Sequence, residues 1–316
     1  MTNGEMPIMN HAKLGNGIEL AFEIHGDPAS PVIFPILGIT DNITDWPPGL
    51  YQPLVDAGFC VICHELRDSG LSTKIERFGP ADLPAAQALL ESGELPDAPY
   101  TIHDVAKDAL LLLDCLSVER ACVVGYSYGS AVAQSLALEA PSRVAALVCL
   151  QGTNYDPALP PRQARVNQAM INATREYDSL EAQINAIEAL RIATNGSAFA
   201  MDKSEARRSA EVSVKRMYYP LGTGRMVLSR LATPPFADKT GAIKCPALIL
   251  HADEDPIFSI EHGEDMARRL GNAELTVLPG AGHNHPASLQ PIIAAALKDF
   301  AEHTLDCRGK NGIKRE

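Results

Sequence analysis

The sequence is short of basic residues and has no long apolar run. Lys and Arg number 27 against 39 Asp and Glu, which gives a formal net charge of −12 at pH 7. Because nucleic acids and anionic membranes bind basic surfaces, we expect neither as a partner. No stretch approaches about 18 uninterrupted apolar residues, so no transmembrane helix is expected. The first residues show no basic segment followed by an apolar one, so we expect no signal peptide and a cytoplasmic location.

The seven cysteines form no recognisable metal-binding or disulfide pattern. Cys60 and Cys63 are the only pair with C-x-x-C spacing, and they fall within an expected strand. Positions three apart in a strand point to opposite faces, which argues against a zinc knuckle or a redox pair. We therefore expect buried free thiols in a reducing compartment.

Short apolar runs alternate with helical patterns along most of the 316 residues. The apolar runs, rich in β-branched residues, span 18–25, 32–37, 60–65, 121–125, 144–151, 247–251 and 273–278. Helical patterns include 101–116, 127–140 and 286–301. Alternation of this kind predicts an α/β fold, in which helices cover both faces of a mostly parallel sheet.

The alternation stops between residues 153 and 235. This stretch has helical patterns, no convincing strand and prolines near both ends. Roughly 80 residues are too many for one crossover connection. We therefore expect a helical cap or lid over 153–235, inserted between the sixth and seventh strands of a core made of 1–152 and 236–316. Ordinary crossover helices are the alternative.

The stretch ACVVGYSYGS at 121–130 carries the clearest chemical motif. Residues 125–129, GYSYG, fit G-x-S-x-G, in which a strand turns sharply into a helix and holds the serine at a strained backbone angle. The positions two before and two after the serine must then lack bulk. Because an apolar run precedes the motif and an amphipathic pattern follows it, we interpret Ser127 as a nucleophile rather than a loop residue.

A serine hydroxyl needs a general base, and the base needs an orienting acid. In folds with this motif the chain order is serine, acid, histidine. Asp255 and His283 each follow an expected strand, where carboxyl ends of parallel strands open onto a crevice. We therefore expect a triad of Ser127, Asp255 and His283. The alternatives are Asp253, Glu254 and Asp156 for the acid and His285 for the base; the other seven histidines are expected to be surface or structural.

The oxyanion of a tetrahedral intermediate needs two donors that are already aimed at it. One candidate is the backbone N–H of Tyr128, at a helix N-terminus where the dipole favours negative charge. The other is the N–H of Ile39, in the loop after 32–37, where Gly38 lets the backbone come close. A plain glycine turn is the alternative. Trp46, the only tryptophan, is expected to pack beneath this loop or to form a wall of the acyl pocket.

Further candidate pocket residues lie in the elbow and in the expected cap. Met217, Tyr218 and Tyr219 cluster in the sequence, and with Tyr126 and Tyr128 they could line an apolar pocket for a bulky or aromatic substrate. Core packing is an equal alternative for each. Residues 64–72, HELRDSGLS, are expected to brace the structure rather than to catalyse.

These segments together resemble the α/β-hydrolase superfamily over roughly 18–152 and 243–304. VIFPILGITDNITDW resembles its oxyanion-loop region, GYSYG its nucleophile elbow, and CPALILHADEDPIF and LPGAGHNHP its acid and histidine loops. More narrowly, WPPGLYQPLVDAGFCVICHELRDSGLST is similar to the capped esterases of the aclacinomycin methylesterase-like branch. Leu37, Glu65 and Ala252 depart from common residues of the superfamily, which have His, Asp and Gly there.

The resemblance implies a mostly parallel eight-stranded sheet and hydrolysis of a small-molecule carboxylic ester through an acyl-enzyme. It implies neither a metal nor an organic cofactor. A lactonase, a C–C bond hydrolase or a cofactor-free perhydrolase on the same apparatus is the alternative function, and a non-catalytic small-molecule receptor is a more distant one. The sequence leaves open whether the chain forms a homodimer.

Overall fold

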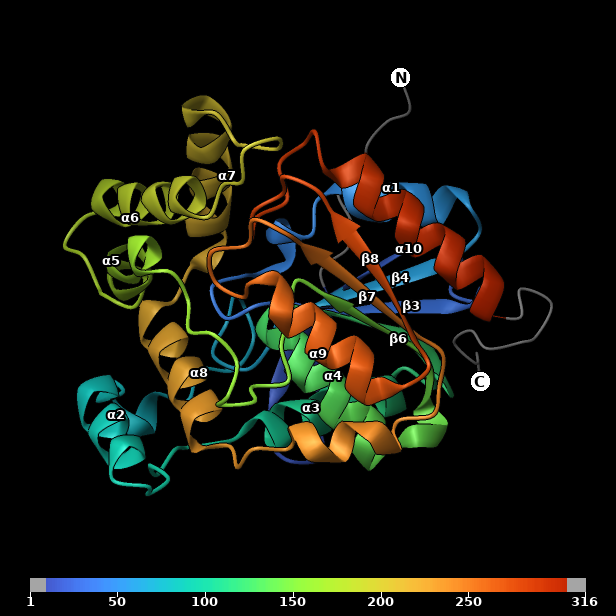
Figure 1. Ribbon diagram of the computed structural model, residues 1–316, viewed down its shortest axis with the longest axis horizontal. Coiled ribbons are helices and arrows are strands. Elements are labelled where there is room, and N and C mark those ends of the chain that lie inside the picture. The colour runs from blue at the N-terminus through green and yellow to red at the C-terminus, as the bar shows by residue number, and fades with distance from the viewer. Residues whose placement is uncertain (1–9, 306–316) are drawn as a thin grey trace.

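A twisted eight-stranded sheet runs through the centre of the computed structural model, which describes residues 10–305 (Figure 1). The strand order is β1-β2-β4-β3-β5-β6-β7-β8. β2 pairs antiparallel with β1 and β4, and the other neighbours pair in parallel, so the predicted fold class is confirmed. The strands are β1 Asn10–Lys13, β2 Glu19–His25, β3 Val32–Ile36, β4 Cys60–His64, β5 Ala121–Tyr126, β6 Val144–Leu150, β7 Ala247–Ala252 and β8 Ala273–Leu278.

Helices cover both faces of this sheet (Figure 1). α1 (Pro48–Asp56) and α10 (Gln290–Thr304) pack on one face, and α3 (Ile102–Cys115), α4 (Tyr128–Glu139) and α9 (Ile260–Leu270) pack on the other. Strands buried on both sides read as continuous apolar runs, which is why the central ones were predictable from sequence. No helix within residues 10–305 is both long enough and apolar enough to cross a bilayer.

The two cysteines of the C-x-x-C spacing lie on opposite faces of the sheet, as predicted. Cys60 belongs to the hydrophobic cluster under α3 and α4, and Cys63 to the cluster under α1 and α10. Both are buried free thiols, and burial raises the pKa of Cys60 to about 12. A thiol with so high a pKa is a poor metal ligand, because the thiolate is the binding form.

The chain between β6 and β7 forms four α-helices, which lie beyond the carboxyl ends of the strands (Figure 1). They are α5 Ala164–Ala173, α6 Leu180–Ala193, α7 Lys203–Met217 and α8 Pro220–Ala232. Apart from one isolated bridge between Phe199 and Ala281, this stretch forms no β-structure, as its sequence predicts. Below, residues 153–235 are called the helical insertion. α2 (Leu83–Glu91), from the β4–β5 connection, packs against α8.

A buried ion pair and a partly buried one fasten the helical insertion to the loop after β4. The Arg225 guanidinium donates to both oxygens of Asp68 at 2.8 Å, and the Arg216 Nε–H donates to Glu65 at 3.0 Å. Removing one partner of such a pair leaves an uncompensated buried charge, which is strongly destabilising. Glu65 and Asp68 belong to HELRDSGLS, so its predicted bracing role is confirmed.

His64, at the end of β4, is a buried imidazole. Its ring stacks on Phe34 at 4.5 Å between centroids, and neither ring nitrogen has a hydrogen-bond partner among the described residues 10–305. Burial lowers the pKa of His64 to about 3. The unfolded chain, whose histidine titrates near 6.5, therefore binds the proton more readily, and stability falls as the pH drops from about 6.5 towards 3.

We expect His64→Leu to make the protein less sensitive to acid. Removing this group should reduce the slope of unfolding free energy against pH by up to about 1.4 kcal/mol per pH unit between pH 6.5 and 4. Denaturant titrations followed by circular dichroism at pH 7.5, 6 and 5 measure that slope. His303→Leu on the exposed face of α10 is the matched control. A slope equal to the wild type in His64→Leu would contradict the assignment.

Candidate active site

Ser127 occupies a sharp turn between β5 and α4. Its backbone angles are φ 54° and ψ −120°, a region that costs free energy for a residue with a side chain. The flanking glycines explain how the turn closes. A Cβ on Gly125 would lie 2.3 Å from the carbonyl oxygen of Gly129, and one on Gly129 would lie 2.0 Å from that of Ile36. The turn thus has the strained geometry that GYSYG predicts.

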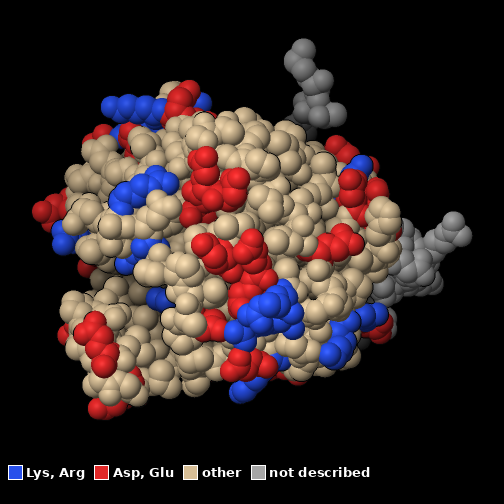
Figure 2. All heavy atoms as spheres, viewed as in Figure 1, with Lys and Arg blue, Asp and Glu red and all other residues tan. Residues whose placement is uncertain are grey.

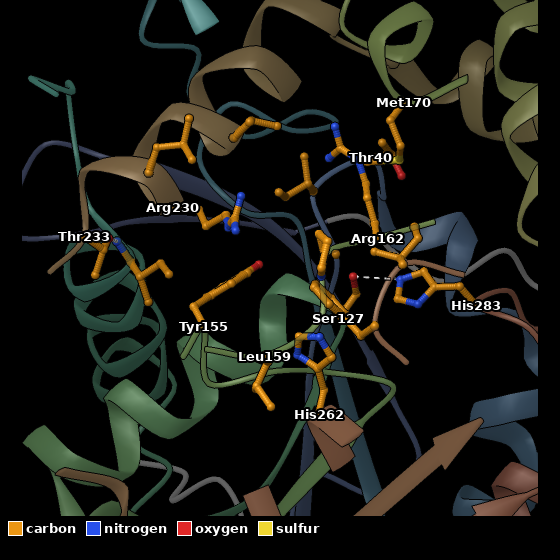
Figure 3. Close-up of a pocket in the computed structure, with 18 of the residues that line it drawn as sticks. Thr40, Ser127, Tyr155, Leu159, Arg162, Met170, Arg230, Thr233, His262 and His283 are labelled. Carbon is orange, nitrogen blue, oxygen red and sulfur yellow. Dashed lines mark hydrogen bonds between the residues drawn. The ribbon is translucent and has the colours of Figure 1, made fainter. Parts of the chain in front are cut away.

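The three expected triad residues lie within hydrogen-bonding distance of one another. His283 Nε2 is 2.9 Å from Ser127 Oγ, drawn as the dashed line in Figure 3, and His283 Nδ1 is 2.6 Å from Asp255 Oδ2. The other oxygen of Asp255 accepts the N–H groups of Ile257 and Phe258 at 2.7 and 2.9 Å. A carboxylate held in this way orients Nδ1–H, which leaves Nε2 free to accept the serine proton.

The alternative acids and base are occupied elsewhere. Asp253 accepts a loop N–H, Glu254 bonds to a serine of the helical insertion, and Asp156 pairs with an arginine of α9. His285 Nε2 lies 2.9 Å from the amide oxygen of Gln151, and burial lowers the pKa of His285 to about 3. The structure therefore brings Asp255, and none of these four, to the imidazole of residue 283.

Hydrogen bonds from three directions fix the loop that carries His283. The Tyr126 hydroxyl donates to the His283 carbonyl oxygen, and the His283 N–H donates to Thr194 at 2.8 Å. The Gln151 side chain donates to the carbonyl oxygen of Gly282 at 2.5 Å. Tyr126, expected to contact substrate, also has this positioning contact. Thr194 and Gln151 were not found from sequence, because their contacts depend on long-range folding.

The loop after β3 runs directly beside Ser127. A Cβ on Gly38 would lie 3.4 Å from the Ser127 Cβ and 2.5 Å from an oxygen of Asp41, so glycine permits this approach. The next residue, Ile39, lines the cavity described below. Tyr128 opens α4, where backbone N–H groups have no helical acceptor. Both proposed donor segments therefore flank the serine.

A buried acid fixes that loop and ties it to the helical insertion. The Asp41 carboxylate accepts the Gly38 N–H at 3.0 Å, and Arg191 of α6 lies 3.8 Å from it and pairs with Asp45. Burial, followed by the charge of Asp45, raises the pKa of Asp41 to about 6, against the opposing effect of Arg191. Sequence reasoning did not find Asp41 or Arg191, since about 150 residues separate them.

Ser127 and His283 open onto a cavity of about 590 Å³. Its walls come from the core loops, the helical insertion and the segment around α2; the surface is hollowed between α2 and α5 (Figure 2). His262, expected to be surface or structural, lies in the wall, where its ring bonds to Thr153 and to a carbonyl oxygen. No three His, Cys, Asp or Glu side chains of residues 10–305 come together to hold a metal ion.

Several of the residues expected to line the substrate pocket do not reach the cavity. Trp46 is buried with its ring edge-on to that of His285, so it packs beneath the site and forms no pocket wall. Met217 is half exposed, Tyr218 bonds to a carbonyl of α5, and Tyr219 packs against Lys and Arg side chains. The Tyr128 ring points into the core, where its hydroxyl bonds to a serine of α8. The expectation that Tyr128, Met217, Tyr218 and Tyr219 line the pocket is therefore corrected, whereas Trp46 packs beneath the site as first expected.

The comparisons with known proteins agree with this architecture. The profile of the alpha/beta hydrolase fold family matches residues 31–285. RutD of Variovorax paradoxus, a carbamate hydrolase by name, is 27% identical over 89% of this chain and 95% of its own. Rhodomycin D methylesterase DnrP of Streptomyces peucetius is 26% identical over 86% and 91%. A thermophilic esterase from Thermogutta terrifontis has a TM-score of 0.69 at 22% identity, over 94% and 99%, which bears on the fold alone.

Proposed function

Since the chain belongs to the α/β-hydrolase fold family, we propose that it is a serine hydrolase that cleaves carboxylic esters through an acyl-enzyme. The observation that carries the proposal is the relay from Asp255 through His283 to Ser127, with distances of 2.6 and 2.9 Å, at the wall of a cavity. Family membership supports hydrolysis in general, and the methylesterase relative supports an ester as the substrate.

In the first half-reaction, Ser127 Oγ attacks the ester carbonyl carbon while His283 Nε2 takes the hydroxyl proton. Asp255 stabilises the imidazolium that forms. The carbonyl oxygen becomes an oxyanion, which the N–H groups of Ile39 and Tyr128 bind. His283 then returns its proton to the leaving alkoxide as the bond between carbonyl carbon and alkoxy oxygen breaks, which leaves Ser127 acylated.

Water completes the cycle. His283 accepts a proton from a water molecule as its oxygen attacks the acyl carbon, and a second oxyanion forms between the same two donors. The bond to Ser127 Oγ then breaks, Oγ regains a proton from His283, and the carboxylic acid leaves. Fixed donors are effective here because they need no reorganisation at the moment of reaction.

We propose further that the helical insertion is a cap that determines which substrates enter. α5, α6 and α7 share a hydrophobic cluster separate from the two clusters of the sheet. Residues of the insertion and of the α2 segment also line the cavity. A cytoplasmic location fits the six cysteines of the described chain, which are all free thiols.

Covalent labelling together with a substrate panel tests the function. A fluorophosphonate should label the intact protein at Ser127, as peptide mass spectrometry would report. The panel contains p-nitrophenyl esters, a lactone, an aryl carbamate and a β-diketone, with products identified by chromatography. We expect ester hydrolysis to have the highest kcat/KM. A protein that neither reacts with the probe nor hydrolyses any ester would overturn the proposal. A higher kcat/KM for the carbamate than for the esters would show that the ester is not the preferred substrate.

A further inference from the structure

Two arginines in the cavity wall have no acidic partner within the part of the chain that the structure describes. Arg162 lies at the exposed rim, and Arg230 extends from α8. The Arg162 Nε–H donates to the amide oxygen of Asn167 at 2.6 Å, and the Arg230 guanidinium lies 4.6 Å from the centre of the Tyr155 ring. Neither guanidinium pairs with any carboxylate of residues 10–305.

The two acids that line the same cavity already have other partners. Asp41 accepts the Gly38 N–H and faces Arg191, and Asp156 pairs with an arginine of α9. The positive charges of Arg162 and Arg230 therefore remain uncompensated at the cavity, although the whole chain carries a net charge of −12. Partial burial, together with the positive charge of Arg230, lowers the pKa of Arg162, so the two guanidinium groups are near enough to repel each other.

Two like charges at the wall of one cavity indicate an anionic ligand. Figure 3 shows the Arg230 guanidinium and the Tyr155 hydroxyl pointing into the cavity across from Ser127. A guanidinium presents its N–H groups in a planar fork that matches the two oxygens of a carboxylate. An anion bound there would relieve the repulsion between the arginines.

Much of the rest of the cavity wall is apolar. Leu159, Met170, Val227, Leu231 and Phe258 all line it. A cavity of about 590 Å³ has room for a ligand that spans both regions. The cavity therefore combines a nucleophile, apolar side chains and two cations.

We propose that the substrate is an ester with an apolar body and a remote carboxylate, which Arg230 and Arg162 bind while Ser127 attacks the ester carbonyl. This inference rests on the proposed function, because it assigns a substrate class to that site. Arg230 and Arg162 select the substrate and take no part in proton transfer.

Two pairs of matched esters test the proposal. p-Nitrophenyl hydrogen adipate against p-nitrophenyl hexanoate places the carboxylate on the acyl side, and 4-acetoxybenzoate against p-tolyl acetate places it on the alcohol side. In at least one pair the wild type should prefer the carboxylate ester. In Arg230→Gln and in Arg162→Gln the ratio of kcat/KM, carboxylate over neutral, should fall about 10- to 100-fold. Arg230→Lys should restore part of that ratio.

A control variant and the activity of the wild type separate failure of this inference from failure of the proposed function. Arg208→Gln, on the exposed surface of α7, removes the same charge outside the cavity and should leave both ratios unchanged. Arg162 is exposed, so Arg162→Gln gives a reading even if Arg230→Gln fails to fold. Active variants with unchanged ratios in both pairs would overturn this inference and leave the esterase proposal standing. A wild type that hydrolyses none of the four esters and resists the fluorophosphonate would overturn both.

Discussion

Ser127→Ala should lower kcat/KM for ester hydrolysis by about 10⁴- to 10⁶-fold while the protein stays folded. The substitution removes the serine oxygen that lies 2.9 Å from the imidazole, and it leaves the cavity and the two proposed oxyanion donors in place. Initial rates with a p-nitrophenyl ester measure the loss, and a thermal melt by circular dichroism checks the fold. Ser204→Ala on the exposed surface of α7 is the matched control and should keep full activity.

The same experiment extends to His283, because triad members act as a unit. His283→Ala should cost about as much as Ser127→Ala, and the double variant should lose little more than either single one. Asp255→Asn should cost about 10⁴-fold, since the imidazole then adopts the wrong tautomer. A Ser127→Ala protein that keeps more than a few per cent of wild-type turnover would mean that another group attacks the ester.

Gly129→Ala should remove most of the stability of the protein. An added Cβ would lie 2.0 Å from the carbonyl oxygen of Ile36 and 2.7 Å from that of Leu37, and both belong to backbone at the end of β3. Backbone in a central parallel strand cannot move aside as a flexible side chain can. We expect a loss above about 4 kcal/mol, a large part of the 5–15 kcal/mol typical of a folded domain, or no soluble protein.

Gly224→Ala supplies the comparison, because the same methyl group meets no obstacle there. Gly224 lies within α8, and its added Cβ would be 3.7 Å from the Ala81 Cβ, an ordinary contact. We expect a gain of about 0.5–1 kcal/mol from the higher helix propensity of alanine. Guanidinium denaturation of both variants measures the contrast. A Gly129→Ala protein within 1 kcal/mol of the wild type would refute the steric explanation of the elbow.

The parts of the fold that sequence predicts are those with a strong local signal. The central strands are continuous apolar runs because both of their faces are buried, and the helical insertion shows helical patterns without a strand-like run. β1, with the sequence NHAK, was not predicted, because an edge strand exposed on alternate residues carries no apolar run. α2 was also left unassigned, so its share of the cavity wall was unexpected.

Some residues of the candidate site were predictable from local sequence, and others were not. GYSYG and the positions of Asp255 and His283 after strands follow from local sequence and from chain order. Asp41 with Arg191, and Arg162 with Arg230, depend on contacts between segments that are far apart in the chain. The tyrosines at 218 and 219 were misassigned for the same reason, because composition marks a residue as suited to a pocket but does not say which way it points.

The contact of Arg191 with Asp41 and Asp45 limits how this enzyme can be rebuilt. Grafting a lid from a relative is an attractive way to change what such a scaffold accepts, but here that exchange would also delete the cation opposite two buried acids. A chimera must carry an arginine at the equivalent position or replace both acids as well. The helical insertion and the loop beside Ser127 therefore cannot be exchanged independently of each other in this chain.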